Sequence, residues 1–261
     1  MAHLMKFRLV YLIILPALCL FMACQSQATT EPQDSNELSP EFISELSLKV
    51  DSLLLSKMRE EHLPGVSAVI VQNGKTLYKK GFGVANVETK QQVNVDTTIF
   101  RIGSVSKAVT MFALTKLVDQ GKLSYETPIS AFFAKIENPF GLQDTVRIKH
   151  ILTHTGGFDQ IGLGRQITEF DLPLEERKKK RPTISEFLEN GNLRRIRPAG
   201  QHFTYDTYGS TLAGVIIEKV TGLSYRDAME MLVFKPLGMS LTSVEVSDEH
   251  RHLLANGHGY R

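Results

Sequence analysis

Two β-rich runs joined by Asn73-Gly74 restrict the fold of this sequence more than any other feature. The segment reads VSAVIVQNGKTLYKKGFG over residues 66–83. Asn-Gly is strongly favoured in two-residue β-hairpin turns, because both central positions take a positive φ. The preceding residues have a helical period, with Ser39-Pro40 as a start signal and Pro64-Gly65 as an end signal. A helix covering an antiparallel sheet, an α+β arrangement, is therefore predicted. The apolar residues of the predicted helix that lie close to helical spacing are Phe42, Leu46, Val50, Leu53 and Leu54.

Residues 1–24 have the pattern of a bacterial export signal. A short basic opening precedes the apolar run LVYLIILPALCLFMA, which ends at Cys24. The alternative is a membrane anchor that stays in place, but the run is short for a membrane span and Pro16 interrupts it. LFMAC resembles a lipobox, with Phe21 as its unusual residue, and this resemblance implies that Cys24 is lipidated. We expect a protein of the cell envelope or periplasm, held by its lipid, with a flexible tether over residues 25–40 and one domain over residues 41–261.

The charge and the cysteines exclude several classes of function. Beyond residue 24 the chain holds 28 basic and 28 acidic residues, so its net charge gives no support to nucleic-acid binding. Both cysteines, Cys19 and Cys24, belong to the signal. The rest of the chain therefore has no disulfide, thiol nucleophile or cysteine-ligated metal. Covalent catalysis would have to use an oxygen or nitrogen nucleophile.

Ser104 and Lys107 stand three residues apart at the start of a helix expected to end at Gly121. Residues i and i+3 share a helix face, so the two side chains can meet. The segment is apolar on nearly every side and should be buried, and burial and the helix dipole would both disfavour a charged lysine. A neutral lysine could take the serine proton, and the Ser104 N–H could hold an oxyanion. The alternative makes Ser104 a helix cap and turns Lys107 toward solvent.

Three stretches carry a family resemblance: TTIFRIGSVSKAVTMFAL, IKHILTHTGGF and RPAGQHFTYDTYGSTLAGVIIEKVTGLSYRDAMEMLVFKPLGM, in this order. Together they resemble the serine β-lactamase and penicillin-binding-protein superfamily, in the branch of class C β-lactamases, DD-peptidases and related esterases. The resemblance covers most of the chain after the tether. It implies an antiparallel sheet flanked by helices, beside an all-helical subdomain, and an acyl-enzyme mechanism without metal or organic cofactor. By matching motifs, Ser104 is the nucleophile, Lys107 handles its proton, and Tyr205 passes protons to and from the leaving group.

The sequence departs from the family pattern in two places. Thr207 stands where the family usually has asparagine, and a hydroxyl cannot supply both functions of an amide to a bound substrate. The family's last motif, Lys-Thr-Gly or His-x-Gly on a strand, would lie beyond residue 261. His258-Gly259-Tyr260 lies too early to be that motif. We therefore expect the final sheet strands to be missing, and the 261-residue chain alone to fold poorly or to lack activity.

His150 and His154 have a spacing that lets two histidines on a helix share a metal ion. No glutamate follows the first histidine and no third ligand is apparent, so a structural role is favoured, with His154 bonded to backbone near the floor of the site. The three histidines of the tail, His250, His252 and His258, offer at most a weak site. G-x-S-x-G, G-x-x-x-x-G-K and G-x-G-x-x-G are all absent from the chain.

Two functions remain open from the sequence. One is an exported serine hydrolase acting on a peptidoglycan-type peptide, a β-lactam or a small ester. The other is an inactive relative, a surface lipoprotein that binds cell-wall peptides or a protein partner. The intact Ser104, Lys107 and Tyr205 favour the hydrolase. Thr207 and the missing third motif favour the inactive relative.

Overall fold

The structure is a computed structural model that describes residues 38–133, 141–159 and 194–257. The predicted signal with its lipobox-like end, and the predicted tether as far as residue 37, lie outside these residues, as does the stretch after Gly257. The chain forms two compact units. Among the described residues, one unit contains residues 38–57 together with Val69–Tyr78, and the other contains Met58–Ala68 and the described residues from Lys79 onward.

Helix α2, Pro40–Glu60, begins and ends close to where the sequence predicts. Ser39 caps it, because its Oγ accepts a hydrogen bond from the Phe42 amide at 3.2 Å. Ile43, Leu46, Val50 and Leu54 are half-buried on one face, at spacings of three and four residues. Phe42 and Leu53, the other apolar residues named from the sequence, are exposed. They lie about one residue, or 100° of helix rotation, away from the half-buried row.

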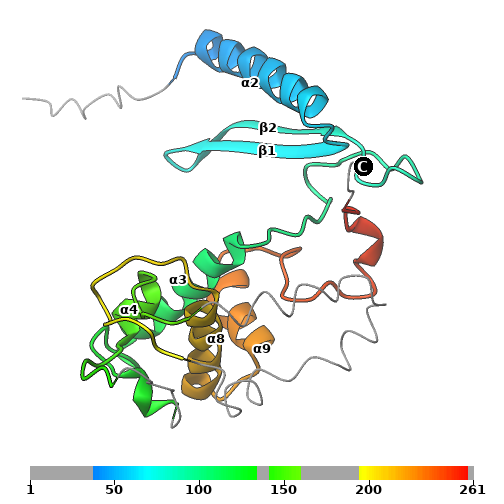
Figure 1. Ribbon diagram of the computed structural model, residues 1–261. Helices are drawn as coiled ribbons and strands as arrows, with labels where there is room; N and C mark the ends of the chain where they lie inside the picture. The colour runs from blue at the N-terminus through cyan, green and yellow to red at the C-terminus, as the bar shows by residue number, and fades with distance from the viewer. Residues whose placement is uncertain (1–37, 134–140, 160–193, 258–261) are drawn as a thin grey trace, which may run out of the picture. The chain divides into compact units, whose positions relative to one another are not determined.

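The predicted hairpin is confirmed. Strand β1, Gly65–Gln72, and strand β2, Lys75–Gly83, pair in a two-stranded antiparallel sheet (Figure 1). Asn73 and Gly74 join them with φ values of 49° and 74°, as a two-residue turn of this type needs. Within the first unit, a hydrogen bond joins the hairpin to α2: the Tyr78 hydroxyl donates to Asp51 Oδ1 at 2.6 Å. Burial and the neighbouring Asp51 carboxylate raise the pKa of Tyr78.

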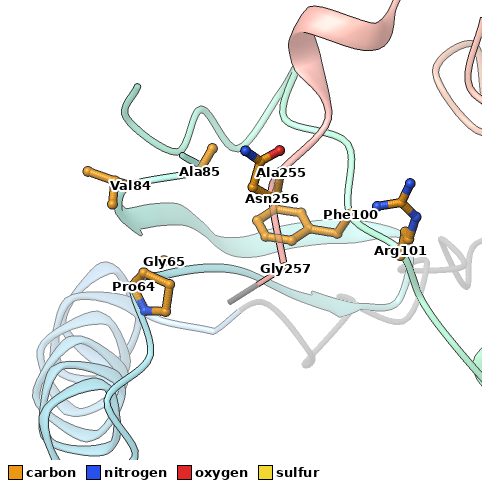
Figure 2. Close-up of a pocket in the computed structure, with 9 residues that line it drawn as sticks. All are labelled: Pro64, Gly65, Val84, Ala85, Phe100, Arg101, Ala255, Asn256 and Gly257. Atoms are coloured by element: carbon orange, nitrogen blue, oxygen red, sulfur yellow. The ribbon is translucent and has the colours of Figure 1, made fainter. Parts of the chain in front are cut away.

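The last described residues run beside the segment that follows β2. The Ile99 amide donates to the Leu253 carbonyl and the Ala255 amide donates to the Ile99 carbonyl, both at 2.9 Å. Ile99 and Leu254 thereby form a parallel bridge. A hollow of about 240 Å³ opens here, lined on one side by Phe100 and Arg101 and on another by Ala255–Gly257 (Figure 2). Its lining includes none of the three residues that the sequence assigns to catalysis.

The second unit has a helical core built on α3, Val105–Asp119, and α8, Thr207–Thr221, which pack together (Figure 1). The sequence predicts a helix over residues 208–221, ended by Gly222, and another over residues 225–234, capped by Ser224. Helix α8 does end at Gly222. Ser224 caps α9, Tyr225–Met229, but the helix continues as a π-helical turn, Glu230–Phe234. The short α4, Ile148–Leu152, packs against α8. The largest fully buried side chains of this core are Leu114, Leu117, Ile129, Ile148, Ile151, Leu212, Ile216, Ile217, Met229 and Val233. None of the helices that the structure describes has both the length and the hydropathy of a membrane span.

Helix α3 is buried on one side, not on nearly every side as the sequence predicts. Leu114 and Leu117 are fully buried, whereas Val105 is 62% and Phe112 is 49% exposed. Val105, Ala108 and Phe112 follow one another at i, i+3 and i+7, so they share a face that the described residues leave open to solvent. An all-apolar helix carries no periodic signal for its buried side, which is why the sequence could not show this.

Candidate functional site

Ser104 is the residue immediately before α3. Its backbone is near the helical region, with φ −70° and ψ −8°, and its side chain makes no capping hydrogen bond. Instead, Lys107 Nζ donates to Ser104 Oγ at 3.1 Å. The same separation serves a proton transfer in the opposite direction when the amine is neutral. Ser104 therefore does not cap α3 through its side chain and lies within hydrogen-bond reach of Lys107.

Lys107 lies between two other members of the site. Its Nζ is 4.9 Å from the centroid of the Tyr205 ring, within the range of a cation–π contact. The side chain is half-buried, so the prediction of a lysine kept away from water is wrong. The start of α3 is open to solvent, since Ser104, Val105 and Ser106 are all exposed.

Tyr205 comes from an extended segment just before α8, about a hundred residues after Ser104 in the chain. Hydrogen bonding by Lys107 and then by Ser104 lowers the pKa of the Tyr205 phenol. The phenol is therefore ionised at a lower pH than an ordinary tyrosine. With 49% of its surface exposed, Tyr205 also remains open to a molecule arriving from solvent. The three residues that the sequence assigns to catalysis are thus brought together.

Thr207 is the first residue of α8, two positions after Tyr205, and its side chain is half-buried. Its carbonyl accepts a hydrogen bond from Thr211 Oγ1 at 3.0 Å. The residue therefore belongs to the segment that carries Tyr205 into the site. Cys24, the residue predicted to be lipidated, lies outside the described residues.

The two histidines each use a ring nitrogen to bind backbone. Nδ1 of His150 accepts from the Arg147 amide at 3.1 Å, and Nδ1 of His154 accepts from the Asp206 amide at 3.0 Å. The predicted bond between His154 and backbone is therefore confirmed. Burial, followed by the charges of Lys149 and Arg147, lowers the pKa of His150. Across residues 38–133, 141–159 and 194–257, no group of three or more His, Cys, Asp or Glu side chains is arranged to hold a metal ion.

One ion pair on the segment that leads to Tyr205 was not predicted from the sequence. Arg195 Nη2 lies 2.6 Å from Asp144 Oδ2, which also accepts from the Ala199 amide at 2.7 Å. Although burial acts to raise it, the Ala199 amide and the Arg195 guanidinium hold the pKa of Asp144 below its usual value. The pair fixes the start of the segment that leads to Tyr205. Fifty-one residues separate its members, so no local pattern could have shown it.

Residues 50–261 match the family described as Beta-lactamase. This chain belongs to the Beta-lactamase family. Esterase EstB of Burkholderia gladioli is 28% identical over 214 residues, which cover 74% of this chain and 50% of that protein. Protein flp of Staphylococcus aureus (strain NCTC 8325 / PS 47) is 30% identical over 196 residues, which cover 75% of this chain and 38% of that protein.

Solved structures of this family share the fold. The octameric penicillin-binding protein homologue from Pyrococcus abyssi is 33% identical with a TM-score of 0.60, over 73% of this chain and 43% of that one. A class C beta lactamase gives a TM-score of 0.66 at 24% identity, over 82% of this chain and 55% of that one. The family and fold class predicted from the sequence are confirmed. The chain spans about half the length, or less, of the relatives it matches.

Proposed function

We propose that this protein is a serine hydrolase that forms an acyl-enzyme on Ser104. The observation that carries the proposal is the meeting of Ser104 Oγ, Lys107 Nζ and the Tyr205 phenol from two distant segments. A serine becomes a useful nucleophile only beside a group that can take its proton, and Lys107 lies within reach. Membership of the Beta-lactamase family supports the same class of reaction.

The proposed reaction divides the work among the three side chains. Lys107 takes the proton of Ser104 Oγ as this oxygen bonds to the substrate carbonyl carbon, and the electron pair of the C=O bond moves to its oxygen. The Ser104 backbone N–H stabilises that oxyanion. When the intermediate collapses, the bond to the leaving group breaks, Tyr205 supplies the proton that this group needs, and Lys107 returns the serine proton to the phenolate. Water then attacks the acyl carbon, the bond to Ser104 Oγ breaks, and one proton of the water restores the serine hydroxyl.

The substrate is proposed to be a small ester, a β-lactam or a peptidoglycan-type peptide, with the ester placed first. Thr207 supports this order because its single hydroxyl cannot offer the paired donor and acceptor with which an amide side chain binds a substrate amide. EstB, which is named an esterase, supports it as well.

Turnover of p-nitrophenyl butyrate, a chromogenic cephalosporin and a D-Ala-D-Ala peptide tests this proposal. We expect ester hydrolysis by the wild-type protein and none by the Ser104→Ala variant. Ester hydrolysis that survives Ser104→Ala would contradict it. A wild-type protein that turns over no substrate and takes no covalent label from a fluorophosphonate would also contradict it, and would favour an inactive binding protein.

We also propose that the protein is exported and held at the cell envelope by a lipid on Cys24. The support is the basic, apolar and cysteine-terminated order of residues 1–24. Such an anchor would leave the domain free to meet cell-wall peptides or small molecules outside the cytoplasm.

A further inference from the structure

The turn that follows α4 holds the segment leading to Tyr205. The Ile196 amide donates to the Gly157 carbonyl at 2.9 Å, and the Gly200 amide donates to the Thr155 carbonyl at 2.8 Å. The later residue of the Tyr205 segment, Gly200, pairs with the earlier residue of the turn, Thr155, so the two segments run antiparallel. The turn, residues 154–157, is thereby fixed to a segment about forty residues later in the chain.

His154, at the start of the turn, accepts hydrogen bonds from the backbone on both sides of Tyr205. Its carbonyl accepts from the Thr204 amide at 2.9 Å. Its ring Nδ1 accepts from the Asp206 amide at 3.0 Å. Asp206 is buried, so the loss of this acceptor would leave the amide without water to replace it. The residues before and after Tyr205 are therefore both tied to His154.

The His154 ring also lies against the Tyr205 ring. The two centroids are 5.1 Å apart and the planes are inclined by 33°. Phe203 packs edge-on against the same imidazole, with centroids 5.9 Å apart. His154 thus restricts the ring of Tyr205 as well as its backbone. His154 takes no part in the Ser104–Lys107 hydrogen bond, so it acts on the site through Tyr205.

The backbone of His154 is adapted to this place. Its φ is +55°, in the left-handed region that residues other than glycine and asparagine rarely enter. For Nδ1 to accept a hydrogen bond, the ring must carry its hydrogen on Nε2. The position therefore requires a side chain with an acceptor near its base, in a residue that tolerates positive φ. Asparagine meets both requirements.

We propose that His154 is a positioning residue for Tyr205, an inference that rests on the role of Tyr205 in the proposed function. His154 binds the amides of Thr204 and Asp206 and stacks on the phenol ring, and in this way it holds the phenol beside Lys107 and Ser104. Without the His154 side chain, the Tyr205 phenol is held less firmly beside Lys107. Its hydrogen bonds to Lys107 and Ser104 then weaken.

Three substitutions of His154 in the full chain separate the acceptor from other effects. His154→Asn keeps an acceptor and suits the backbone. His154→Gly removes the acceptor without backbone strain, and His154→Leu removes it while keeping apolar bulk. The first measurement is the phenol titration of Tyr205, taken as the difference from the same protein with Tyr205→Phe, since the chain has 7 tyrosines. The second is the rate at which a fluorophosphonate labels Ser104.

We expect His154→Asn to keep the lowered pKa of the Tyr205 phenol and a labelling rate within about threefold of wild type. In His154→Leu and His154→Gly the phenol pKa should rise toward that of free tyrosine, and labelling should slow by at least about tenfold. A Leu or Gly variant that titrates and reacts like wild type overturns the proposal. An Asn variant as impaired as these two overturns it as well.

Two further results keep the test decisive. If wild-type protein takes no label, the proposed function fails, while the phenol titration still decides whether His154 positions Tyr205. If the Leu and Gly variants do not fold, nitrogen NMR of the wild-type imidazole decides instead. Hydrogen on Nε2, with a coupling between Nδ1 and the Asp206 amide, supports the proposal, and hydrogen on Nδ1 contradicts it.

Discussion

At the scale of single residues, Lys107 is the side chain that contacts both Ser104 and Tyr205. It donates to Ser104 Oγ at 3.1 Å and lies over the Tyr205 ring. We predict that Lys107→Met slows acylation of Ser104 by about 10²- to 10⁴-fold, the usual contribution of a general base. Stopped-flow labelling with a fluorophosphonate measures the rate. Lys122→Met, at an exposed residue beyond the end of α3, is the matched control and should react like wild type.

Tyr205 gives the site a predictable dependence on pH. Because Lys107, and then Ser104, lower the phenol pKa, the phenolate is populated at a lower pH than in free tyrosine. A step in the pH–rate profile that belongs to Tyr205 should therefore lie below the ordinary tyrosine pKa of about 10. We expect that step to disappear in Tyr205→Phe and to move to higher pH in Lys107→Met. A step that persists unchanged in Tyr205→Phe belongs to another group and contradicts the assignment.

At the scale of elements, the turn after α4 depends on Gly157. A Cβ there would lie 2.2 Å from the Arg197 carbonyl oxygen, and φ is +75°. We predict that Gly157→Ala lowers the free energy of unfolding by roughly 2–4 kcal/mol. Gly74→Ala is the control, because Gly74 has a similar φ and no atom within 4 Å of its Cβ position. It should cost only about 1 kcal/mol. Urea unfolding of both variants compares the two, and equal losses would contradict the close approach.

The buried ion pair that supports the same segment can be tested through Asp144. Arg195 keeps 6% and Asp144 keeps 32% of its side-chain surface exposed. Asp144→Ala should lower the free energy of unfolding by about 3 kcal/mol, since it leaves a buried guanidinium without its partner. The lowered pKa of Asp144 means that the pair stabilises the fold above the ordinary aspartate pKa of about 3.9, and that this stability is lost as the pH falls through the lower folded value. Thermal melts from pH 2 to pH 7 should show a smaller acid-induced loss in the variant.

The sequence predicted those turns and helix ends that depend on neighbouring residues. The Asn73-Gly74 turn, the Ser39 cap and the end of α8 at Gly222 all depend on residues within a few positions of one another. Ser104 and Lys107 were found because their pairing is also local, one helix turn apart. The exposed side of α3 and the Asp144–Arg195 pair depend on packing between distant segments, which periodicity does not report. Tyr205 was predicted only through the family resemblance. The contacts that His154 makes on both sides of it are visible only in the structure.

At the scale of the whole molecule, we predict that the protein is attached to a membrane through a lipid on Cys24. Cys24→Ala should move the protein from the membrane fraction to the soluble fraction and prevent incorporation of radiolabelled palmitate, because it removes the thiol proposed to carry the lipid. Cys19→Ala removes the other cysteine and should leave both properties unchanged. Membrane attachment that persists without palmitate labelling in Cys24→Ala would favour the retained apolar anchor.

The most direct test of the central claim is mass spectrometry of the protein after treatment with a fluorophosphonate. The wild-type chain should gain the mass of one phosphonyl group, and peptide mapping should place it on Ser104. Ser104→Ala should gain none, and Lys107→Met should gain it slowly. An adduct on another residue, or one that forms equally well on Ser104→Ala, would contradict the assignment of Ser104 as the nucleophile.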